Sequence, residues 1–494
     1  MSIARSTALL SVARLVTIVL NIFALPLYLD WIGEGGYGQI EWIVLIVNYC
    51  VLVFDPGFSL SNQNQLGSAH TAGDNDRFGK LFRSHRTMLA GLGVIGIAIN
   101  VFLPLIYRPD WYINNRDYSL FFLFAGLQLF FYFQSVVYTG VFASKREFGI
   151  VAKANVIGSI INAVVSLTGV YFIRHPWAFV LGNVVQGIIV TGILHWNIRK
   201  ESYAGFSLDF YRDLYAPNFS FAKKYAWNNV GTILGKVDRS VIESVLSAKA
   251  LGIYGAAARF PAIYGDLMPL NQVYQPELAR AYEEGPSVFS KMIYGALLAT
   301  FAIIATSLFI PSSLAEPLLR ALLRAKYSPE MAPIFVAACL DHGLSIYGTM
   351  VSVCAFAARK PQMTTPFVLY FGILTCSLAY PVAIHFGIVG IAWSRVGIQL
   401  SQFFILEWVI RKYLAPEFPY AKFMRKKILM AVFAAVFWGL GFALTQIPLI
   451  AQYPVVALSM APIITLPYLL VLVRTRTITL PEKISNKIPI LRVK

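Results

Sequence analysis

The sequence predicts an all-α polytopic membrane protein with about fourteen transmembrane helices. Three observations indicate this class: 57% of the 494 residues are hydrophobic, only 13% are charged, and the mean hydropathy is +0.64. This composition is typical of chains that cross a bilayer repeatedly, and it excludes a soluble globular domain. No small-residue cleavage site interrupts the first apolar run, which we therefore interpret as an uncleaved span and not as a signal peptide.

Apolar windows of about 20 residues identify the individual spans. The fourteen candidates occupy residues 8–29, 38–58, 87–107, 118–141, 154–173, 177–197, 225–246, 251–273, 292–314, 331–358, 364–385, 388–410, 428–447 and 454–473.

Lysine and arginine are distributed unequally between the two sides of these spans. Of the 41 basic residues, 29 fall on the side of the N-terminus, seven on the opposite side and five inside spans. Because cytoplasmic loops carry an excess of Lys and Arg, we expect both termini to be cytoplasmic. The net charge of +17 then mainly reflects topology, and no nucleic-acid partner is expected.

Two sequence matches at nearly equal offsets indicate an internal repeat. The segment Glu34–Gly38 opens the second span, and Ala250–Gly255 opens the eighth, 217 positions later. Phe142–Arg146 closes the fourth span and Phe356–Lys360 closes the tenth, 214 positions later. Matches on the same side of the membrane predict two parallel six-helix bundles around a central cavity.

The repeat divides the chain into five parts. They are an N-terminal bundle (1–200), a cytoplasmic linker (201–224), a C-terminal bundle (225–412), two additional transmembrane helices (413–473) and a basic cytoplasmic tail (474–494).

Cations inside spans are candidates for binding an anionic substrate, because charges that persist at bilayer depth usually face a bundle interior or a watery cavity. These cations are Arg14, Lys236, Arg239, Arg259 and Arg395. Their donors suit a diphosphate headgroup. Two alternatives stay open: Arg239 and Glu243 are i,i+4 neighbours that can pair, and Arg259 and Arg395 can snorkel to the outer interface.

Acidic residues inside spans are candidates for ion coupling, because a carboxylate in a low dielectric can bind a proton or Na⁺ near neutral pH. These acids are Glu41, Asp55, Asp238 and Asp266. Under the repeat offset Glu41 aligns with Ala258, beside Arg259, so Glu41 and Arg259 could face each other across the halves. Asp55 precedes Pro56, where a structural turn or cap is the alternative role.

Sequence motifs for catalysis are missing. Gly231–Val237 resembles a phosphate loop, but it has three residues between its glycines where the motif has four, and Val replaces the Ser or Thr that reaches the metal. The six histidines show no metal-ligand spacing. We therefore expect no enzyme, no catalytic residue, no metal site and no cofactor.

Several segments resemble the polysaccharide-transporter branch of the multidrug/oligosaccharidyl-lipid/polysaccharide (MOP) flippase superfamily, the group that includes the O-antigen flippase Wzx. The segments are Gly36–Gly38, Asp55–Phe58, Asp238, Leu251–Tyr254 and Ala256–Arg259. The resemblance extends over residues 5–415. Glu41 and the Lys236–Arg239 cluster depart from the family pattern, so no family role is carried over to them.

The resemblance implies a flippase in the cell inner membrane that moves an undecaprenyl-diphosphate-linked oligosaccharide, such as an O-antigen or capsule repeat unit, by alternating access coupled to a proton or Na⁺ gradient. Membrane lipids, a polysaccharide polymerase and a chain-length regulator are the implied partners. The alternative is a multidrug or small-molecule exporter of the same superfamily, which would favour an acidic, aromatic cavity. A membrane glycosyltransferase would present catalytic carboxylates on a large outer loop, and the outer loops here are short.

Overall fold

The described part of the chain is helical in the computed structural model, and no strand occurs in it. It comprises residues 3–107, 117–145, 147–201, 203–205, 207–267, 274, 278, 280–358, 360, 363–410, 412, 415, 417–447 and 454–474. An all-helical architecture agrees with the fold class predicted from composition, because helices satisfy every backbone hydrogen bond within one segment of a bilayer-spanning chain.

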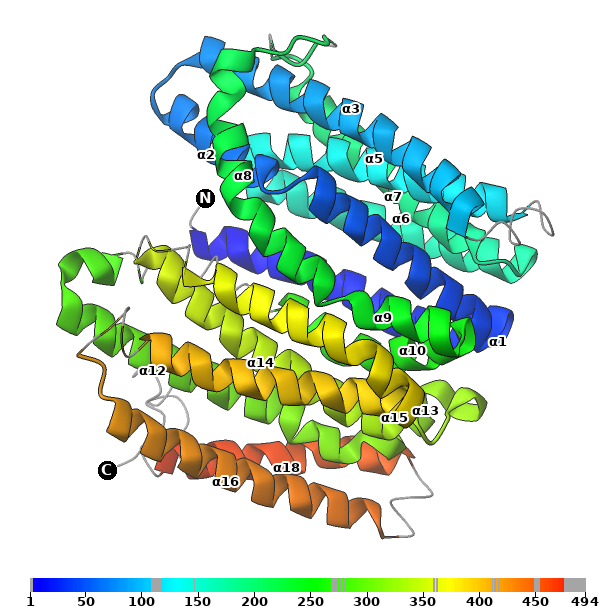
Figure 1. The fold of residues 1–494 in the computed structure, drawn as a ribbon, viewed down its shortest axis with the longest axis vertical. Helices are drawn as coiled ribbons and strands as arrows, with labels where there is room; N and C mark the ends of the chain where they lie inside the picture. The colour runs from blue at the N-terminus through cyan, green and yellow to red at the C-terminus, as the bar shows by residue number, and fades with distance from the viewer. Residues whose placement is uncertain are drawn as a thin grey trace. The chain divides into compact units, whose positions relative to one another are not determined.

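The chain forms two compact units that divide after Gly252, and Figure 1 shows their helices. The helices of unit 1 are α1 (Ile3–Phe54), α2 (Phe58–Thr71), α3 (Asn75–Tyr107), α5 (Asp117–Ser144), α6 (Phe148–Ile173), α7 (Trp177–Ile198), α8 (Arg212–Leu234), α9 (Val237–Val241) and the π-helical turn η1 (Ile242–Leu246). Helix α10 (Ala248–Leu267) begins in unit 1 and continues into unit 2.

Unit 2 contains the remaining elements. They are α12 (Pro286–Ile304), the short turns η2 (Ala305–Phe309) and η3 (Pro311–Leu314), α13 (Ala315–Leu323), η4 (Arg324–Lys326), α14 (Met331–Ala357), α15 (Thr365–Val409), α16 (Tyr420–Thr445) and α18 (Pro454–Arg474).

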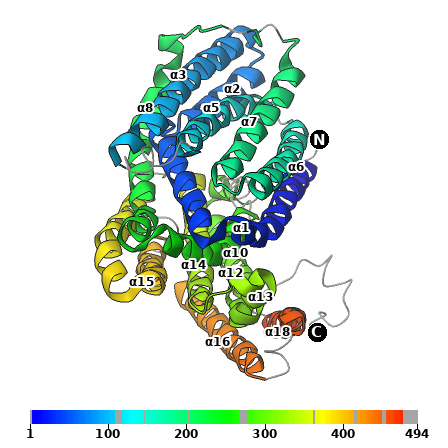
Figure 2. The ribbon, with the colours of Figure 1, turned by 90° about the vertical axis from the view of Figure 1, so that its right-hand side faces the viewer.

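Packing in unit 1 is centred on α5. Helix α5 packs against α3 on one side and α7 on the other, and α6 packs against both α7 and α1 (Figure 2). Glycine at the helix contacts allows this close packing. A Cβ atom on Gly126 of α5 would lie only 2.7 Å from the Cα of Ile97 in α3, so a larger residue would force the two helices apart. Helix α8 packs against α1, α2 and α3, so the segment that follows the α7–α8 connection stays with unit 1.

The core of unit 2 joins α12, α14, α15, α16 and α18. It includes the fully buried rings of Phe289, Tyr347, Phe423 and Tyr468. Helices α16 and α18 pack against each other (Figure 1), and both also contact the η3 turn. The C-terminal helix pair is therefore joined to the rest of unit 2 by a continuous apolar core.

Two long helices are each broken by a glycine in the left-handed backbone region. Gly33 (φ 71°) interrupts α1, and Gly387 (φ 61°) interrupts α15. Only glycine adopts such angles without a steric penalty, so each break divides one long helix into two of the spans that were predicted from hydropathy.

Helix boundaries repeat between the two units. Helix α5 ends at Ser144 and α14 at Ala357, 213 positions later, while α6 starts at Phe148 and α15 at Thr365, 217 positions later. The break at Arg174 (φ 56°) between α6 and α7 corresponds to the break at Gly387, 213 positions later. These separations agree with the sequence offsets of 217 and 214, so the repeat is visible in the backbone itself.

The predicted spans lie on helices throughout the described residues. Nine helices of that part are long and apolar enough to cross a membrane, and two of them, the described part of α1 and α15, each cover two predicted spans. The total of fourteen spans stays a prediction. Unit 1 also extends through α8, α9 and η1, whereas the repeat assigns residues 225–252 to a second bundle; the bundle boundary likewise stays a prediction.

Candidate functional site

The predicted seventh span is a broken helix. Helix α8 ends at Leu234, Gly235 and Lys236 form a turn, and the five-residue helix α9 runs directly into the π-helical turn η1. Interruptions of this kind are frequent at functional positions in transporters, where short helix ends replace a continuous lipid-facing span. The break places Asp238, Arg239 and Glu243 on short elements next to α1.

An ion pair joins α1 to α9. The Arg239 Nη1 atom donates to Glu41 Oε2 at 3.5 Å, and the Tyr37 hydroxyl donates to Glu41 Oε1 at 2.8 Å. Glu41 is 4% exposed, whereas the Arg239 side chain is 31% exposed. The N···O separation is long for a hydrogen bond, so the contact is a loose ion pair that a competing ligand can open.

Further hydrogen bonds hold the two segments together around this pair. The Tyr49 hydroxyl lies 3.3 Å from Ser240 Oγ, and the Asn229 side-chain amide donates to the Leu52 carbonyl oxygen at 2.7 Å. Tyr49 and Leu52 both follow Glu41 along α1, so these bonds hold α8 and α9 against the part of α1 that follows the ion pair.

A cavity of about 370 Å³ lies beside the ion pair, within unit 1. Its wall is formed by Trp42, Ile46, Tyr49, Ile99, Asn100, Phe122, Val237, Ser240, Val241, Glu243 and Ser244. The cavity thus combines aromatic rings with one carboxylate, hydroxyl groups and an amide. This combination of apolar walls and a few polar groups is typical of small-molecule and ion sites.

Asn100 presents an acceptor in this wall. Its side-chain amide nitrogen donates to the Gly96 carbonyl oxygen at 2.9 Å, but its Oδ1 atom is buried without a hydrogen-bond partner. An unsatisfied buried acceptor close to the Glu243 carboxylate favours a ligand that donates protons or carries positive charge. We call the group Tyr37, Glu41, Asn100, Arg239 and Glu243 the α1–α9 site.

Unit 2 contains two largely buried ion pairs between helices. Arg395 of α15 donates from Nε to Asp341 Oδ2 of α14 at 3.0 Å, and both side chains are largely buried. Lys427 of α16 forms a buried ion pair with Glu407 of α15, which also accepts a hydrogen bond of 3.2 Å from the Tyr347 hydroxyl. Arg395 therefore has a carboxylate partner, which is the structural role that charged residues inside membranes most often have.

Asp55 lies directly after α1. The Ser59 backbone amide donates to Asp55 Oδ1 at 3.0 Å, so this carboxylate satisfies one of the free amides in the first turn of α2, as a helix cap does. Its role in ion coupling stays a prediction.

The family described as polysaccharide biosynthesis protein matches residues 35–332, more than half of the 494 residues. The chain belongs to this family. No curated protein matches its sequence.

The fold of this polysaccharide biosynthesis family member is that of MOP superfamily transporters. It is similar to the lipid II flippase MurJ in an inward closed conformation, with a TM-score of 0.67 and 13% identity over 95% of this chain and 99% of that one. It is also similar to an inward-facing multidrug resistance MATE family transporter of the MOP superfamily, with a TM-score of 0.62 and 14% identity over 81% of this chain and 98% of that one. A third similar structure is a MOP superfamily transporter from Pyrococcus furiosus, with a TM-score of 0.57 and 14% identity over 83% of this chain and 96% of that one.

The remaining predicted site residues of this family member are only partly placed. Lys236 is half-buried at the start of α9, Asp238 is 1% exposed, and Arg259 is half-buried in α10. The side chains of Arg14 and Asp266 lie outside the described residues. The roles of these predicted residues in substrate binding and ion coupling stay predictions.

Several polar residues were not predicted as site residues. Glu243 was considered only as a partner of Arg239, and Glu407 was not considered although it is the one acid in its predicted span, 388–410. Asn100 and Tyr37 are uncharged, so a pattern of charged residues inside spans does not indicate them as site residues. The position of Asn100, a polar residue inside the predicted span 87–107, is the sequence feature that indicates it.

Proposed function

We propose that this chain is a non-hydrolytic flippase for an undecaprenyl-diphosphate-linked oligosaccharide, the repeat unit of an O-antigen, capsule or exopolysaccharide. Family membership carries this proposal, since the family is described as polysaccharide biosynthesis protein. The likeness of the fold to a lipid II flippase supports the same class of substrate, a sugar on a lipid carrier. In this proposal the protein lies in the inner membrane with both termini in the cytoplasm, and a polymerase and a chain-length regulator use the exported unit.

The Glu41–Arg239 pair supports a coupling step by alternating access. Glu41 accepts from Tyr37 and from Arg239. A proton or Na⁺ at Glu41 would weaken its attraction for Arg239, and the freed guanidinium could then bind a phosphate oxygen. Lys236 and Arg259, together with Arg14, would supply further donors to the diphosphate, and Asp55, Asp238 and Asp266 are the further candidates for ion coupling.

The identity of the lipid-linked intermediate that accumulates after gene deletion tests this function. We expect a complete repeat unit on its undecaprenyl carrier to build up on the inner leaflet, with loss of surface polysaccharide. Mass spectrometry of extracted lipids measures the amount of this intermediate. The comparison with and without phosphatase digestion of intact cells shows in which leaflet the intermediate lies. Unchanged intermediate levels together with normal surface polysaccharide would contradict the proposal.

Multidrug export is the second candidate function. It is favoured by the composition of the cavity, in which Glu243 lies among the aromatic side chains of Trp42, Tyr49 and Phe122, and the fold likeness to MATE transporters is compatible with it. Susceptibility of a pump-deficient host to cationic drugs separates the two functions: an increase in drug tolerance upon expression, which Glu243→Gln abolishes, would support export of cations.

A further inference from the structure

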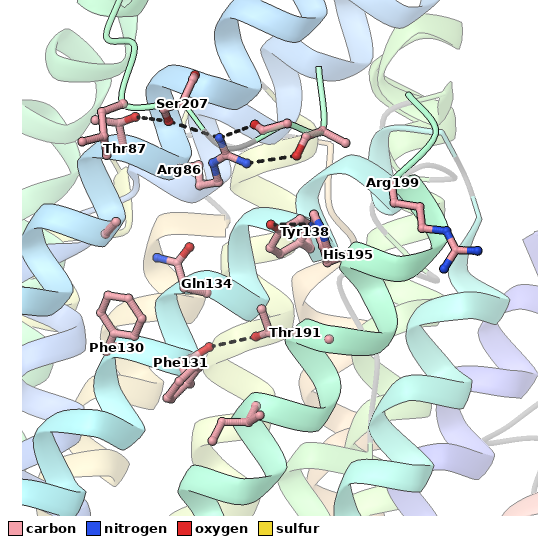
Figure 3. Close-up of a pocket in the computed structure, with 16 residues that line it drawn as sticks. Arg86, Thr87, Phe130, Phe131, Gln134, Tyr138, Thr191, His195, Arg199 and Ser207 are labelled. Atoms are coloured by element: carbon pink, nitrogen blue, oxygen red, sulfur yellow. Dashed lines mark hydrogen bonds between the residues drawn. The ribbon is translucent and has the colours of Figure 1, made fainter. Parts of the chain in front are cut away.

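A second cavity in unit 1, of about 510 Å³, has no lining residue in common with the α1–α9 site. It lies between α3, α5 and α7, and Figure 3 shows the side chains that line it. A chain segment between α7 and α8, residues 203–205 and 207–211, covers one end; we call this segment the strap. The cavity lies at the end of unit 1 that the charge distribution predicts to be cytoplasmic.

Arg86 of α3 fixes the strap over the cavity. Its guanidinium is buried and donates to three backbone carbonyl oxygens, those of Ala204 (3.3 Å), Gly205 (2.7 Å) and Ser207 (3.1 Å). Thr87 Oγ1 adds a bond of 3.1 Å to the Asp209 carbonyl oxygen. These bonds hold the Arg86 guanidinium beside the cavity.

The opposite end of the cavity is closed by tight helix packing. A Cβ atom on Gly93 of α3 would lie 2.8 Å from the Phe130 ring, and one on Gly187 of α7 would lie 2.7 Å from the Phe131 Cβ atom. Helices α3 and α7 thus both close onto α5 at the level of Phe130 and Phe131 and separate toward the strap. The cavity has an apolar floor and polar groups nearer its roof.

Two described residues of the cavity lining, Gln134 of α5 and Ser207 of the strap, have a buried side-chain atom without a hydrogen-bond partner. Gln134 is 9% exposed, and its amide nitrogen is buried without a hydrogen-bond partner. Figure 3 shows its amide below Arg86, facing the space that the hydrogen-bonded pair of Tyr138 and His195 also borders. A buried amide without a partner costs free energy that a bound acceptor would recover.

We expect the open edge of the cavity to lie at the level of a membrane interface, because it is close to the end of the predicted span 177–197. Ile188 and Leu208 are exposed at this edge, and His195 and Arg199 lie beside them. The Arg199 guanidinium stacks over the exposed ring of Trp196 and is turned outward in Figure 3. Tryptophan concentrates at the headgroup level of bilayers, which places the mouth where lipid headgroups lie.

Positive charge exceeds negative charge around this mouth. Three neighbouring cations are already in ion pairs, namely Lys80–Asp76, Arg83–Asp209 and Lys145–Glu201. Among the described residues, Arg199 forms no ion pair. Arg199, which lines the cavity, therefore adds a positive charge to the mouth. Basic pockets between membrane helices on the cytoplasmic side typically bind anionic lipid headgroups.

We propose that the cavity under the strap binds the phosphate headgroup of an anionic glycerophospholipid, such as phosphatidylglycerol, from the surrounding bilayer. The Gln134 amide and the Arg199 guanidinium donate to the phosphodiester, while an acyl chain leaves along Phe130 and Ile188 into the membrane. The bound lipid contacts the strap and thereby stabilises the position of the α7–α8 connection against α3. The proposal does not depend on which substrate the protein transports.

Native mass spectrometry of the full-length protein with added lipid tests the site. We expect phosphatidylglycerol to remain bound with an apparent Kd about tenfold lower than that of phosphatidylcholine with the same acyl chains, because charge-assisted hydrogen bonds to phosphate need net positive surroundings. Gln134→Leu and Arg199→Gln should each weaken phosphatidylglycerol binding by about tenfold. Lys200→Gln is the matched control, since it removes the same charge one residue later but does not line the cavity.

Hydrogen exchange of the strap gives a second measurement. Phosphatidylglycerol should slow exchange of the backbone amides of residues 207–211 in the wild type and in Lys200→Gln, and it should not do so in Arg199→Gln. Because Arg199 is exposed, this variant is expected to fold even if Gln134→Leu does not.

Four outcomes would overturn the proposal. They are equal retention of phosphatidylglycerol and phosphatidylcholine, unchanged binding in Arg199→Gln, protection of the strap by inorganic phosphate alone, and preferential binding of undecaprenyl phosphate over phosphatidylglycerol. The third would identify a free-anion site, and the fourth would assign the cavity to the path of a polyprenyl carrier.

Discussion

Gly38 of α1 and Gly252 of α10 approach each other so closely that neither position has room for a Cβ atom. A Cβ on Gly38 would lie 1.7 Å from the Ala248 carbonyl oxygen, and one on Gly252 would lie 1.9 Å from the Glu34 carbonyl oxygen. The two glycines belong to the repeated sequence segments, Glu34–Gly38 and Ala250–Gly255. The matched motifs thus contact each other backbone to backbone, which explains why both contain glycine.

We expect Gly252→Ala to destabilise the protein severely, because its obstacle is backbone that cannot rotate away. Overpacking in a well-packed region typically costs about 1–3 kcal/mol, and a clash with the α1 backbone at Glu34 and Gly38 should lie at or above the upper end. The measurement is the thermal midpoint of the detergent-purified protein by fluorescence-detected size exclusion.

Gly35→Ala is the control for this substitution. Gly35 lies three residues before Gly38, and a Cβ there would meet nothing within 4 Å. Alanine should be tolerated or should add up to about 1 kcal/mol through helix propensity. Equal midpoints for Gly252→Ala and Gly35→Ala would show that the close contact is not maintained.

The Glu41–Arg239 pair predicts an asymmetric mutational response. Arg239→Ala removes an ion-pair partner from the buried Glu41 carboxylate, while Glu41→Gln removes one from a cation that is partly exposed. Since the loss of an ion-pair partner costs a buried charge more than an exposed one, Arg239→Ala should reduce stability by about 1–3 kcal/mol and Glu41→Gln by less. Thermal midpoints of both variants measure the difference.

A nearby exposed pair provides the comparison. Lys249 lies 3.4 Å from Glu34, but its side chain is 68% exposed, so Lys249→Ala should change stability by less than about 0.5 kcal/mol. If Lys249→Ala and Arg239→Ala were equally harmful, the burial argument for Glu41 would be wrong.

Sequence reasoning located the helices and the repeat because both depend on local patterns. Apolar windows marked all the helices of the described residues that qualify as spans, and offsets close to those of the motifs separate the ends of α5 and α14 and the starts of α6 and α15. The glycines also helped to identify the two repeated motifs, but the sequence did not predict that the two copies touch each other.

Contacts between distant segments could not be predicted in the same way. Arg239 and Glu41 are 198 positions apart, whereas helical spacing relates Arg239 only to near neighbours such as Glu243. Position next to a span does not predict exposure either: Arg86 and Lys427 directly precede the predicted spans 87–107 and 428–447, on the predicted cytoplasmic side, yet they are only 6% and 5% exposed. The positive-inside pattern reports the side of the membrane on which a charge lies, not whether a neighbouring helix covers it.

Transport should depend on the cations of the broken span and its surroundings. Replacing Lys236, Arg14 and Arg259 together by Ala should lower polysaccharide export at least about tenfold, because each cation would contribute a charge-assisted hydrogen bond to the diphosphate. Surface polysaccharide and the lipid-linked intermediate should be quantified at matched protein levels. Lys249→Ala is the control for loss of a surface charge, and full export by the triple variant would remove the basis for diphosphate binding by these residues.

The buried pair Lys427–Glu407 predicts strong non-additivity. Tyr347 donates to Glu407, and the Lys427 ammonium also lies 3.9 Å from the Phe403 ring centroid, so removing either charge leaves the other in an apolar core. Lys427→Met or Glu407→Leu alone should each cost about 3–5 kcal/mol, whereas the double variant should approach wild-type stability, as apolar replacement of buried ion pairs often does. A double-mutant cycle of thermal midpoints measures the coupling energy, which should exceed about 2 kcal/mol. Additive single effects would mean that the two side chains are separately solvated and that the pair does not hold α16 to α15.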